Sequence, residues 1–366
     1  MVIDWSDGNK SSLYSLWLRD HCQMPESRNL DNGQRLFSVK DLPSNITIEK
    51  AYKDAEGNVC VMFQPENHFS VFCQKWLREN CYELNSHFED RSEKSKKLWK
   101  KDSFDNGLPF ISYDLMHSDD TSKVLALRSL REYGFFVLND VPTQDGQVLK
   151  VISELGFTRE TNYGALFQVR TEVNPNNLAF TNLGLGSHTD NPYRDPVPTV
   201  QLLHCLESST EGGESILVDG FKAASILREE SEESFLSLAN TWINYRFSDS
   251  KTELRSRVPM IELNDKKEVI KVRYNNRSID TINVPQDKMR SFYKAYRHWS
   301  EVIERDELKI QFKLSEGDLM LFDNTRVMHA RTEFSKSGKR HLQGAYSDLD
   351  GLYSLLNRLE MKNNND

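Results

Sequence analysis

Three residues that are far apart in the sequence have the types and the spacing of a metal site. His188 and Asp190 stand two positions apart in the segment GSHTD, and His329 lies in the segment LMLFDNTRVMHAR. Side chains two positions apart on an extended segment project to the same side, so both can reach one ion. Two imidazoles and one carboxylate are the ligands of non-haem Fe(II) oxygenases, in which other coordination positions stay open. We therefore predict an iron site made by His188, Asp190 and His329.

A receptor for a carboxylate follows at fixed distances. Arg340 comes 340 − 329 = 11 residues after His329, and Ser215 comes 215 − 190 = 25 residues after Asp190. An arginine guanidinium offers paired donors in a rigid fork that matches a carboxylate, and a serine hydroxyl can add another donor. The alternative is a surface pair of histidines beside an ordinary ion pair. That alternative requires five residue types to occur in this order by coincidence.

Apolar strands have to position these residues. The segments TVQLLHCL, ESILVDGF, EVIKVRYNN, LKIQFKL and DLMLFDN are separated by Gly, Asp and Asn turns, which predicts strands. We predict one helix that is capped by Asp120 or Thr121 and ends at Gly134, one over FKAASILREESEESFLSLA and one over QDKMRSFYKAYRHWSEVIE. Many strands with long insertions fit a sandwich or barrel better than an alternating βαβ sheet. The fold class that we predict is mainly β with helices (α+β).

A polar and charge-dense segment, about residues 83–107, divides the chain. Upstream of it, Ile46 and Ile48 alternate with polar residues, and Val59, Val61 and Phe63 do the same after an EGN turn. This pattern is typical of a hairpin. We predict a small β-rich N-terminal domain over residues 1–95 and a second domain over residues 96–366.

The composition argues against several classes of protein. The 366 residues include 47 Lys and Arg against 55 Asp and Glu, a net charge of −8 that is unsuited to nucleic-acid binding. No apolar run approaches the roughly 20 residues that span a bilayer, and the first residues lack the pattern of a secretory signal. The five cysteines form no CxxC pair and are expected to be reduced thiols. We expect a soluble, cytoplasmic protein with no nucleic-acid or membrane partner.

The sequence resembles the Fe(II)/2-oxoglutarate-dependent oxygenases, in the branch that contains γ-butyrobetaine dioxygenase, trimethyllysine dioxygenase and bacterial 2-(trimethylamino)ethylphosphonate dioxygenase. The resemblance runs over nearly the whole chain, from LWLRDHC through GSHTDNPYRDP, VQLLHCLE and GGESILVDGF to RYNN, FDNTRVMHAR and RHLQGAYSD. It implies a double-stranded β-helix (jelly-roll) in the second domain. It also implies Fe(II) on His188, Asp190 and His329, with 2-oxoglutarate and O2 as cosubstrates. Arg340, helped by Ser215, is then the receptor for the far carboxylate of 2-oxoglutarate. Relatives are often dimers, which leaves a homodimer open.

The resemblance also implies a substrate that contains a trimethylammonium group. This group has no N–H to donate, so it is held by cation–π attraction to aromatic faces. The implied substrate pocket consists of an aromatic cage (Tyr163, Phe167, Phe180 and Tyr346) and an anion site with its neighbours (Asn177, Asn191, Tyr193, Asn275, Asn276 and Arg277). For any single aromatic residue, an ordinary place in the core is the alternative.

Two positions in this pocket depart from the animal γ-butyrobetaine pattern. Asn191 stands where those enzymes have Tyr, and Arg277 stands where they have Ala. An added guanidinium favours an anion with more charge and more acceptor oxygens. We therefore expect hydroxylation of 2-(trimethylamino)ethylphosphonate to its 1-hydroxy product, with succinate and CO2 released. The alternatives are conversion of γ-butyrobetaine to L-carnitine, a non-catalytic betaine-binding protein of the same fold, and a metal-dependent hydrolase, for which no general base is evident near HTD.

The N-terminal domain departs from the family pattern at a structural zinc site. Relatives bind this zinc with three closely spaced Cys and a later His. Cys22 and His68 match two of these ligands, but Met24 and Ser27 occupy the other Cys positions. A structural zinc takes four nitrogen or sulfur ligands in most proteins, so we expect no zinc, with apolar packing in its place. His21 is the one nearby residue that could substitute as a ligand.

Overall fold

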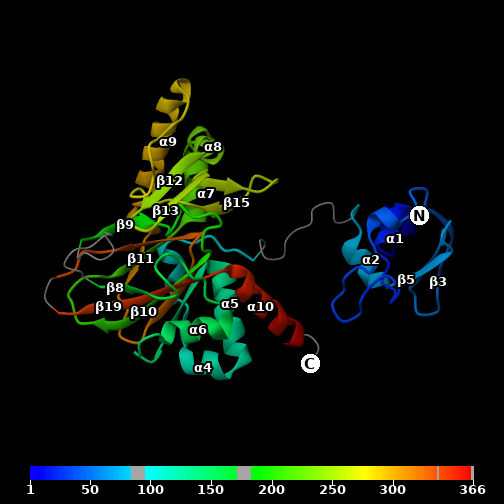
Figure 1. Cartoon of the computed structure of the whole chain (residues 1–366), viewed down its shortest axis with the longest axis horizontal. Coiled ribbons are helices and arrows are strands. Elements are labelled where there is room, and N and C mark those ends of the chain that lie inside the picture. Colours follow the sequence, from blue (N-terminus) through cyan, green and yellow to red (C-terminus); the bar gives the residue numbers. More distant parts are fainter. Residues whose placement is uncertain (84–94, 171–182, 336–337, 364–366) are drawn as a thin grey trace. The chain divides into compact units, whose positions relative to one another are not determined.

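The computed structural model describes residues 1–83, 95–170, 183–335 and 338–363. The chain divides into two compact units, Met1–Lys94 and Ser95–Asp366, and each is described by itself (Figure 1). Within the described ranges, no helix combines the length and the apolar character that crossing a membrane requires.

The first unit is built on a three-stranded antiparallel sheet. Its elements are β1 (Val2–Asp4), β2 (Lys10–Ser12), α1 (Ser15–Asp20), η1 (Val39–Asp41), β3 (Thr47–Lys53), β4 (Val59–Gln64), β5 (His68–Phe72) and α2 (Gln74–Asn80). The predicted hairpin is present as β3 and β4, with Ile48 opposite Phe63. Val61 and Phe63 of β4 pack with Leu18 of α1 and Leu77 of α2, so this unit has an apolar core of its own.

Two sheets form the centre of the second unit. The six-stranded sheet has the order β6 (Phe110–Ser112), β7 (Phe135–Asn139), β17 (Leu319–Asp323), β10 (Val200–Ser208), β19 (Arg340–Ser347) and β8 (Phe167–Val169). The four-stranded sheet has the order β16 (Ile310–Phe312), β11 (Ser215–Asp219), β18 (Val327–Arg331) and β9 (Leu185–His188). One apolar cluster joins Phe322 of the first sheet to Leu217 and Val327 of the second, so the sheets pack face to face. The predicted jelly-roll class is confirmed.

Helices cover the other face of the six-stranded sheet. They are α4 (Tyr113–Ser118), α5 (Asp120–Tyr133), α6 (Gln147–Leu155) and α10 (Leu349–Asn363), which lie together in Figure 1. Leu127, Ile152 and Leu356 from these helices pack in one cluster with Leu202 of β10. The predicted end of α5 at Gly134 is confirmed, because Gly134 has a left-handed φ of 83°. The predicted cap was wrong: Asp119 is the N-cap, and its carboxylate accepts a hydrogen bond from the Ser122 amide.

A long insertion packs on the smaller sheet. It contains α7 (Gly220–Glu230), α8 (Glu232–Asn240), β12 (Ile243–Ser248), β13 (Glu253–Val258), β14 (Ile261–Leu263), β15 (Val269–Val272) and α9 (Gln286–Ile303). The 3₁₀ turns η2 (Lys101–Phe104) and η4 (Asp306–Leu308) complete the unit. The prediction of one helix over the α7–α8 segment was wrong. Ser231 is extended, with φ −160°, and its hydroxyl caps α8 through the Ser234 amide.

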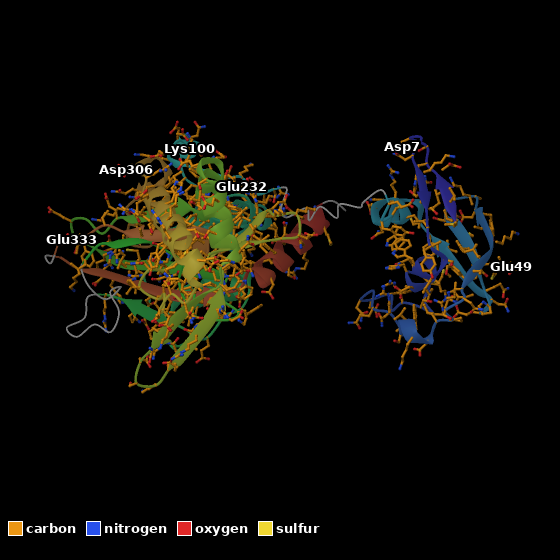
Figure 2. The ribbon with its side chains drawn as sticks, turned by 90° about the horizontal axis from the view of Figure 1, so that it is seen from above. Asp7, Glu49, Lys100, Glu232, Asp306 and Glu333 are labelled. Atoms are coloured by element: carbon orange, nitrogen blue, oxygen red, sulfur yellow. The ribbon has the colours of Figure 1, made fainter. Side chains whose placement is uncertain are left out.

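Many charged side chains lie on the outside of both units, where they stay hydrated. Figure 2 labels six exposed examples: Asp7 and Glu49 in the first unit, and Lys100, Glu232, Asp306 and Glu333 in the second.

Candidate functional site

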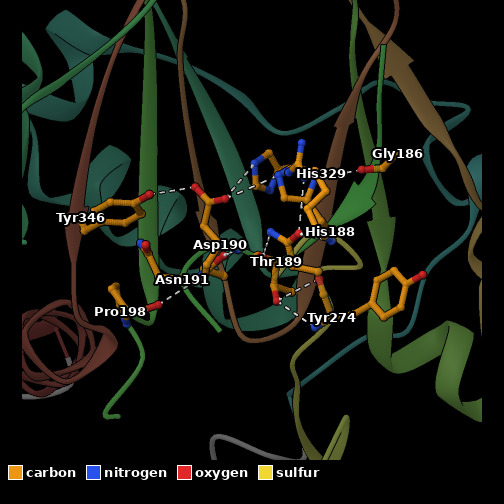
Figure 3. A network of polar contacts seen from close by, with 12 residues as sticks. Gly186, His188, Thr189, Asp190, Asn191, Pro198, Tyr274, His329 and Tyr346 are labelled. Carbon is orange, nitrogen blue, oxygen red and sulfur yellow. Dashed lines mark hydrogen bonds and ion pairs between the residues drawn. The ribbon is translucent and has the colours of Figure 1, made fainter. Parts of the chain in front are cut away.

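Strand pairing brings the two histidines together. β9 and β18 run antiparallel with His188 directly opposite His329, and their ring centroids are 4.2 Å apart. Asp190 follows β9, and its Oδ1 lies 3.5 Å from Nε2 of His188 and 4.0 Å from Nε2 of His329 (Figure 3). In the described part of the chain, this is the one group of three or more His, Cys, Asp or Glu donors that converges on a point. The three predicted metal ligands therefore meet.

Hydrogen bonds on both sides fix the backbone of this HTD segment (Figure 3). The Thr189 amide donates to the Tyr274 carbonyl at 2.7 Å, and the Tyr274 amide donates to Thr189 Oγ1 at 3.0 Å. Asn324 accepts from the Asp190 amide at 2.7 Å and donates to the Asp190 carbonyl at 2.9 Å. Asn324 was not identified from the sequence. It holds Asp190 in place from the loop that leads into β18.

The protonation states of the three residues fit a divalent iron. Nδ1 of His188 donates to the Gly186 carbonyl at 2.9 Å, which leaves the Nε2 lone pair for a metal. Burial, together with the neighbouring His188, lowers the pKa of His329 to about 3, so this imidazole is neutral. Burial alone would raise the pKa of Asp190, but the nearby imidazoles of His188 and His329 and the hydrogen bond from the Tyr346 hydroxyl lower it below the usual range. Two neutral imidazoles and one carboxylate are the donor set that Fe(II) accepts.

A cavity of about 410 Å³ opens beside these residues, a volume suited to small ligands. It is lined by the three metal-ligand candidates and by nine other predicted residues: Tyr163, Phe167, Asn191, Tyr193, Ser215, Asn275, Arg277, Arg340 and Tyr346. Asn276 is exposed and accepts a hydrogen bond from Tyr296 of α9, and it does not line the cavity. Asn177 and Phe180 lie outside the described residues.

Aromatic rings form a continuous wall of this cavity. Phe167 stacks on Tyr346 at 5.1 Å and lies 6.3 Å from Tyr163. Gly344 makes room for this stack, because a Cβ at that position would lie 2.2 Å from Cζ of Phe167. Phe247 was not identified from the sequence, although it stands in the alternating segment INYRFS of β12. It lines the cavity and its ring lies 5.9 Å from Tyr163.

A chain of hydroxyl contacts orients the amide of Asn191. The hydroxyls of Tyr163 and Tyr193 are 3.1 Å apart, and the Tyr193 hydroxyl donates to Asn191 Oδ1 at 2.8 Å. Asn191 is 3% exposed, and its Nδ2 has no hydrogen-bond partner among the described residues. A buried amide of this kind is a donor available to a ligand.

Three arginines, in addition to Arg246 that pairs with Glu253, give the cavity a positive charge. The side chain of Arg340 lies over the Phe334 ring and makes no hydrogen bond or ion pair with another described residue. The side chain of Arg277 donates one long hydrogen bond, at 3.4 Å, to Asn275. Arg331, which sequence reasoning missed, is buried, and burial together with the other two arginines lowers its pKa to about 9. Asp190 is the one acidic residue among the described lining residues. The cavity is therefore suited to anionic ligands.

The zinc position of the first unit contains a hydrogen-bonded thiol. Cys22 is fully buried, and its Sγ lies 3.3 Å from Nε2 of His68. Ser70 donates to the same sulfur at 3.0 Å, and the Met24 amide donates at 3.5 Å. These polar contacts stand where apolar packing was expected, so that expectation was wrong.

The other zinc-ligand positions are unsuited to a cation. Ser27 accepts a hydrogen bond from the Arg19 guanidinium at 3.4 Å, and Arg19 forms an ion pair with Glu66 at 3.1 Å. His21 donates from Nδ1 to the Trp17 carbonyl at 2.7 Å. A fixed guanidinium beside two nitrogen or sulfur donors does not fit a tetrahedral zinc.

Comparisons with known proteins match both units. Residues 105–346 match the family described as "Taurine catabolism dioxygenase TauD, TfdA family", and residues 1–78 match "Gamma-butyrobetaine hydroxylase-like, N-terminal". The chain is 32% identical over 354 residues to a gamma-butyrobetaine dioxygenase of Pseudomonas sp. (strain AK-1), covering 96% of this chain and 91% of that protein. It is 31% identical to the gamma-butyrobetaine dioxygenase of Homo sapiens, covering 99% and 95%. A trimethyllysine dioxygenase of Meyerozyma guilliermondii is 27% identical, covering 98% and 93%.

Solved structures share the fold of this chain over 64% of its length. Asparagine oxygenase in complex with Fe(II), 2S,3S-3-hydroxyasparagine and succinate matches with a TM-score of 0.50 at 16% identity, over 64% of this chain and 82% of that one. A putative alpha-ketoglutarate-dependent taurine dioxygenase from Burkholderia xenovorans matches with a TM-score of 0.50 at 14% identity, over 64% and 88%.

Proposed function

The chain belongs to the TauD, TfdA family of dioxygenases, and we propose that it hydroxylates a small zwitterion with a trimethylammonium group at one end and an anion at the other. It is an enzyme that depends on Fe(II) and 2-oxoglutarate. When bound, the iron with 2-oxoglutarate and O2 supplies the oxidation that places a hydroxyl oxygen on a C–H carbon, with succinate and CO2 as the other products. The non-catalytic alternative is set aside.

In this proposal, His188, Asp190 and His329 hold the iron through two neutral nitrogens and one carboxylate oxygen. Arg340 and Ser215 receive the far carboxylate of 2-oxoglutarate. Arg340 faces the cavity without an anionic partner among the described residues, which a bound dicarboxylate would supply.

The cation end of the substrate is assigned to the aromatic wall. Tyr163, Phe167 and Tyr346 line the same cavity as the metal-ligand candidates, and this is the observation that carries the proposal. A trimethylammonium group gains about 0.5–2 kcal/mol from each ring face, more when it is desolvated. Phe180 remains a predicted fourth wall.

The anion end is assigned to Arg277, Asn275 and Asn191, and it favours a phosphonate. The Arg277 guanidinium lines the cavity, and the buried Nδ2 of Asn191 is an unpartnered donor among the described residues. A phosphonate has three acceptor oxygens and more negative charge than a carboxylate, so it can use both groups. The finer proposal is conversion of 2-(trimethylamino)ethylphosphonate to its 1-hydroxy product.

A second candidate reaction is hydroxylation of γ-butyrobetaine to L-carnitine. Two relatives that are named gamma-butyrobetaine dioxygenases align with 96% and 99% of this chain, which favours this reaction.

An assay of succinate release with Fe(II) and O2 separates the candidates when 2-(trimethylamino)ethylphosphonate, γ-butyrobetaine and trimethyllysine are compared side by side. The phosphonate should give the highest kcat/KM. The proposal would be contradicted if none of the three compounds raised succinate release above the substrate-free rate.

Arg277→Ala tests the role of charge at the anion site. We expect kcat/KM for the phosphonate to fall about 100-fold, because two charge-assisted hydrogen bonds of about 1.5 kcal/mol each are lost. The loss with γ-butyrobetaine should stay near tenfold. Arg246→Ala is the matched control, since Arg246 also lines the cavity but pairs with Glu253 at 2.9 Å. Equal losses on both substrates would count against the phosphonate.

A further inference from the structure

The two oxygens of Asp190 have different environments. Oδ1 is the atom that lies near Nε2 of both histidines, whereas Oδ2 accepts a hydrogen bond from the Tyr346 hydroxyl at 2.8 Å (Figure 3). We propose that the Tyr346 hydroxyl is a positioning group that holds Asp190 so that only Oδ1 faces the metal. The resemblance assigned only the ring of Tyr346, as a wall of the cage. This inference does not depend on which substrate the enzyme uses.

The position of Tyr346 is fixed by its surroundings. It lies on β19 with Gln201 of β10 directly opposite, and it is 3% exposed. Phe167 stacks on its ring at an interplanar angle of 27°. A ring held on a central strand and by a stacked neighbour has little freedom to move its hydroxyl away from Asp190.

The contact is a hydrogen bond from a phenol to a carboxylate oxygen. A hydrogen bond to a charged acceptor of this kind is stronger and shorter than one between neutral groups.

Holding one carboxylate oxygen has a consequence for the number of open metal positions. Carboxylates bind metals through one oxygen or through two. In an octahedral ion, two histidines and one oxygen occupy three positions and leave three for other ligands, whereas a two-oxygen carboxylate would leave only two. A cosubstrate that takes two positions would then leave none for O2. The Tyr346 hydroxyl, by engaging Oδ2, keeps the third position available.

Tyr346→Phe tests the inference, because it removes one oxygen atom and keeps the ring, the stack and the aromatic wall. The experiment titrates the metal-free full chain with Co(II) and then titrates the Co(II)-loaded chain with 2-oxoglutarate, both by calorimetry and without substrate. Loss of an outer hydrogen bond to a metal ligand typically weakens metal binding about 10-fold to 100-fold. We expect a loss of at least tenfold in Co(II) affinity, in 2-oxoglutarate affinity or in both.

Tyr245→Phe is the matched control. Its hydroxyl is also buried and donates to the Arg273 carbonyl at 2.7 Å, but it does not line the cavity. Both variants should unfold near the wild-type temperature, since each loses a single buried hydroxyl. The inference is overturned if Tyr346→Phe binds Co(II) and 2-oxoglutarate as the wild type does. It is also overturned if Tyr245→Phe shows the same losses.

Discussion

Gly213 leaves the space that the Arg340 side chain occupies. Its φ is +70°, and a Cβ there would lie 3.0 Å from Nε of Arg340. Gly213→Ala therefore adds a steric contact that pushes the guanidinium away, in addition to the cost of about 1 kcal/mol for a left-handed alanine. We expect KM for 2-oxoglutarate to rise about tenfold, which is the effect of losing about 1.4 kcal/mol of binding. Steady-state succinate assays at saturating substrate measure this rise.

Gly146→Ala separates strain from contact. Gly146 has a similar φ of +75°, but a Cβ there meets nothing within 4 Å. Both variants should lose similar stability, and only Gly213→Ala should raise KM for 2-oxoglutarate. If the two variants had the same KM, the proposed role of Gly213 beside Arg340 would be wrong.

At the residue scale, the sequence could predict residue types but not their hydrogen-bond partners. His188, Asp190 and His329 were predicted because their types and spacing fit one metal, and the structure places them together. The hydrogen bonds of Asn324 and Tyr346 to Asp190 depend on a loop conformation and a side-chain rotamer, which spacing does not determine. Arg331 lies two positions after His329 and gave no separate signal.

At the element scale, the apolar segments of the sequence were sufficient to predict strands β10, β11, β16 and β17 of the two sheets. The register that sets His188 opposite His329 follows from β9 and β18 pairing, and no local pattern specifies that pairing. The β12–β13 hairpin was not predicted, because the second strand, ELRSRV, has only two apolar residues, although the first strand, INYRFS, alternates apolar and polar residues. The break between α7 and α8 was missed because a single serine cap outweighed a continuous helical pattern.

Strand β10 contains a buried histidine that makes the stability of the second unit depend on pH. His204 is fully buried, and burial lowers its pKa to about 4 from an ordinary value of 6.5. The unfolded chain therefore binds a proton below pH 6.5 that the folded chain does not bind until about pH 4. The contribution of His204 to the free energy of unfolding is fully present above pH 6.5. It is lost as the pH falls towards 4, which lowers the free energy of unfolding by about 3 kcal/mol. We expect His204→Leu to reduce this loss.

The measurement is the free energy of unfolding in denaturant at pH values between 7.5 and 4.5. The buried His329 contributes to the pH dependence of both proteins, so the difference between wild type and variant isolates His204. His117→Leu is the control, because that side chain is 63% exposed. Parallel pH curves for the wild type and His204→Leu would contradict the prediction.

At the scale of the whole molecule, the two units have separate cores, and they differ in whether their side chains form a site that fits a metal ion. The second unit brings its donors together across two strands, whereas the first combines a thiol, an imidazole and a buried guanidinium that a zinc ion does not fit. Sequence comparison with a family pattern could predict that the zinc ligands were incomplete. It could not predict which contacts take the place of the zinc ion, because Arg19 and Glu66 are 47 positions apart and their contact depends on the fold.

The first unit should therefore keep its stability when metals are removed. We expect hydrogen exchange of the β3–β5 amides in the full chain to be the same with and without a chelator, because hydrogen bonds and the Arg19–Glu66 pair do the stabilising there. Peptides over β9 and β18 supply the internal control, since loss of iron should speed their exchange. Arg19→Met should speed exchange in β3–β5 in both conditions, because breaking a buried ion pair costs about 3 kcal/mol. Faster β3–β5 exchange in the chelator-treated wild type would show that a metal stabilises this unit after all, and the reading of Cys22 and His68 as a hydrogen-bonded pair would have to be abandoned.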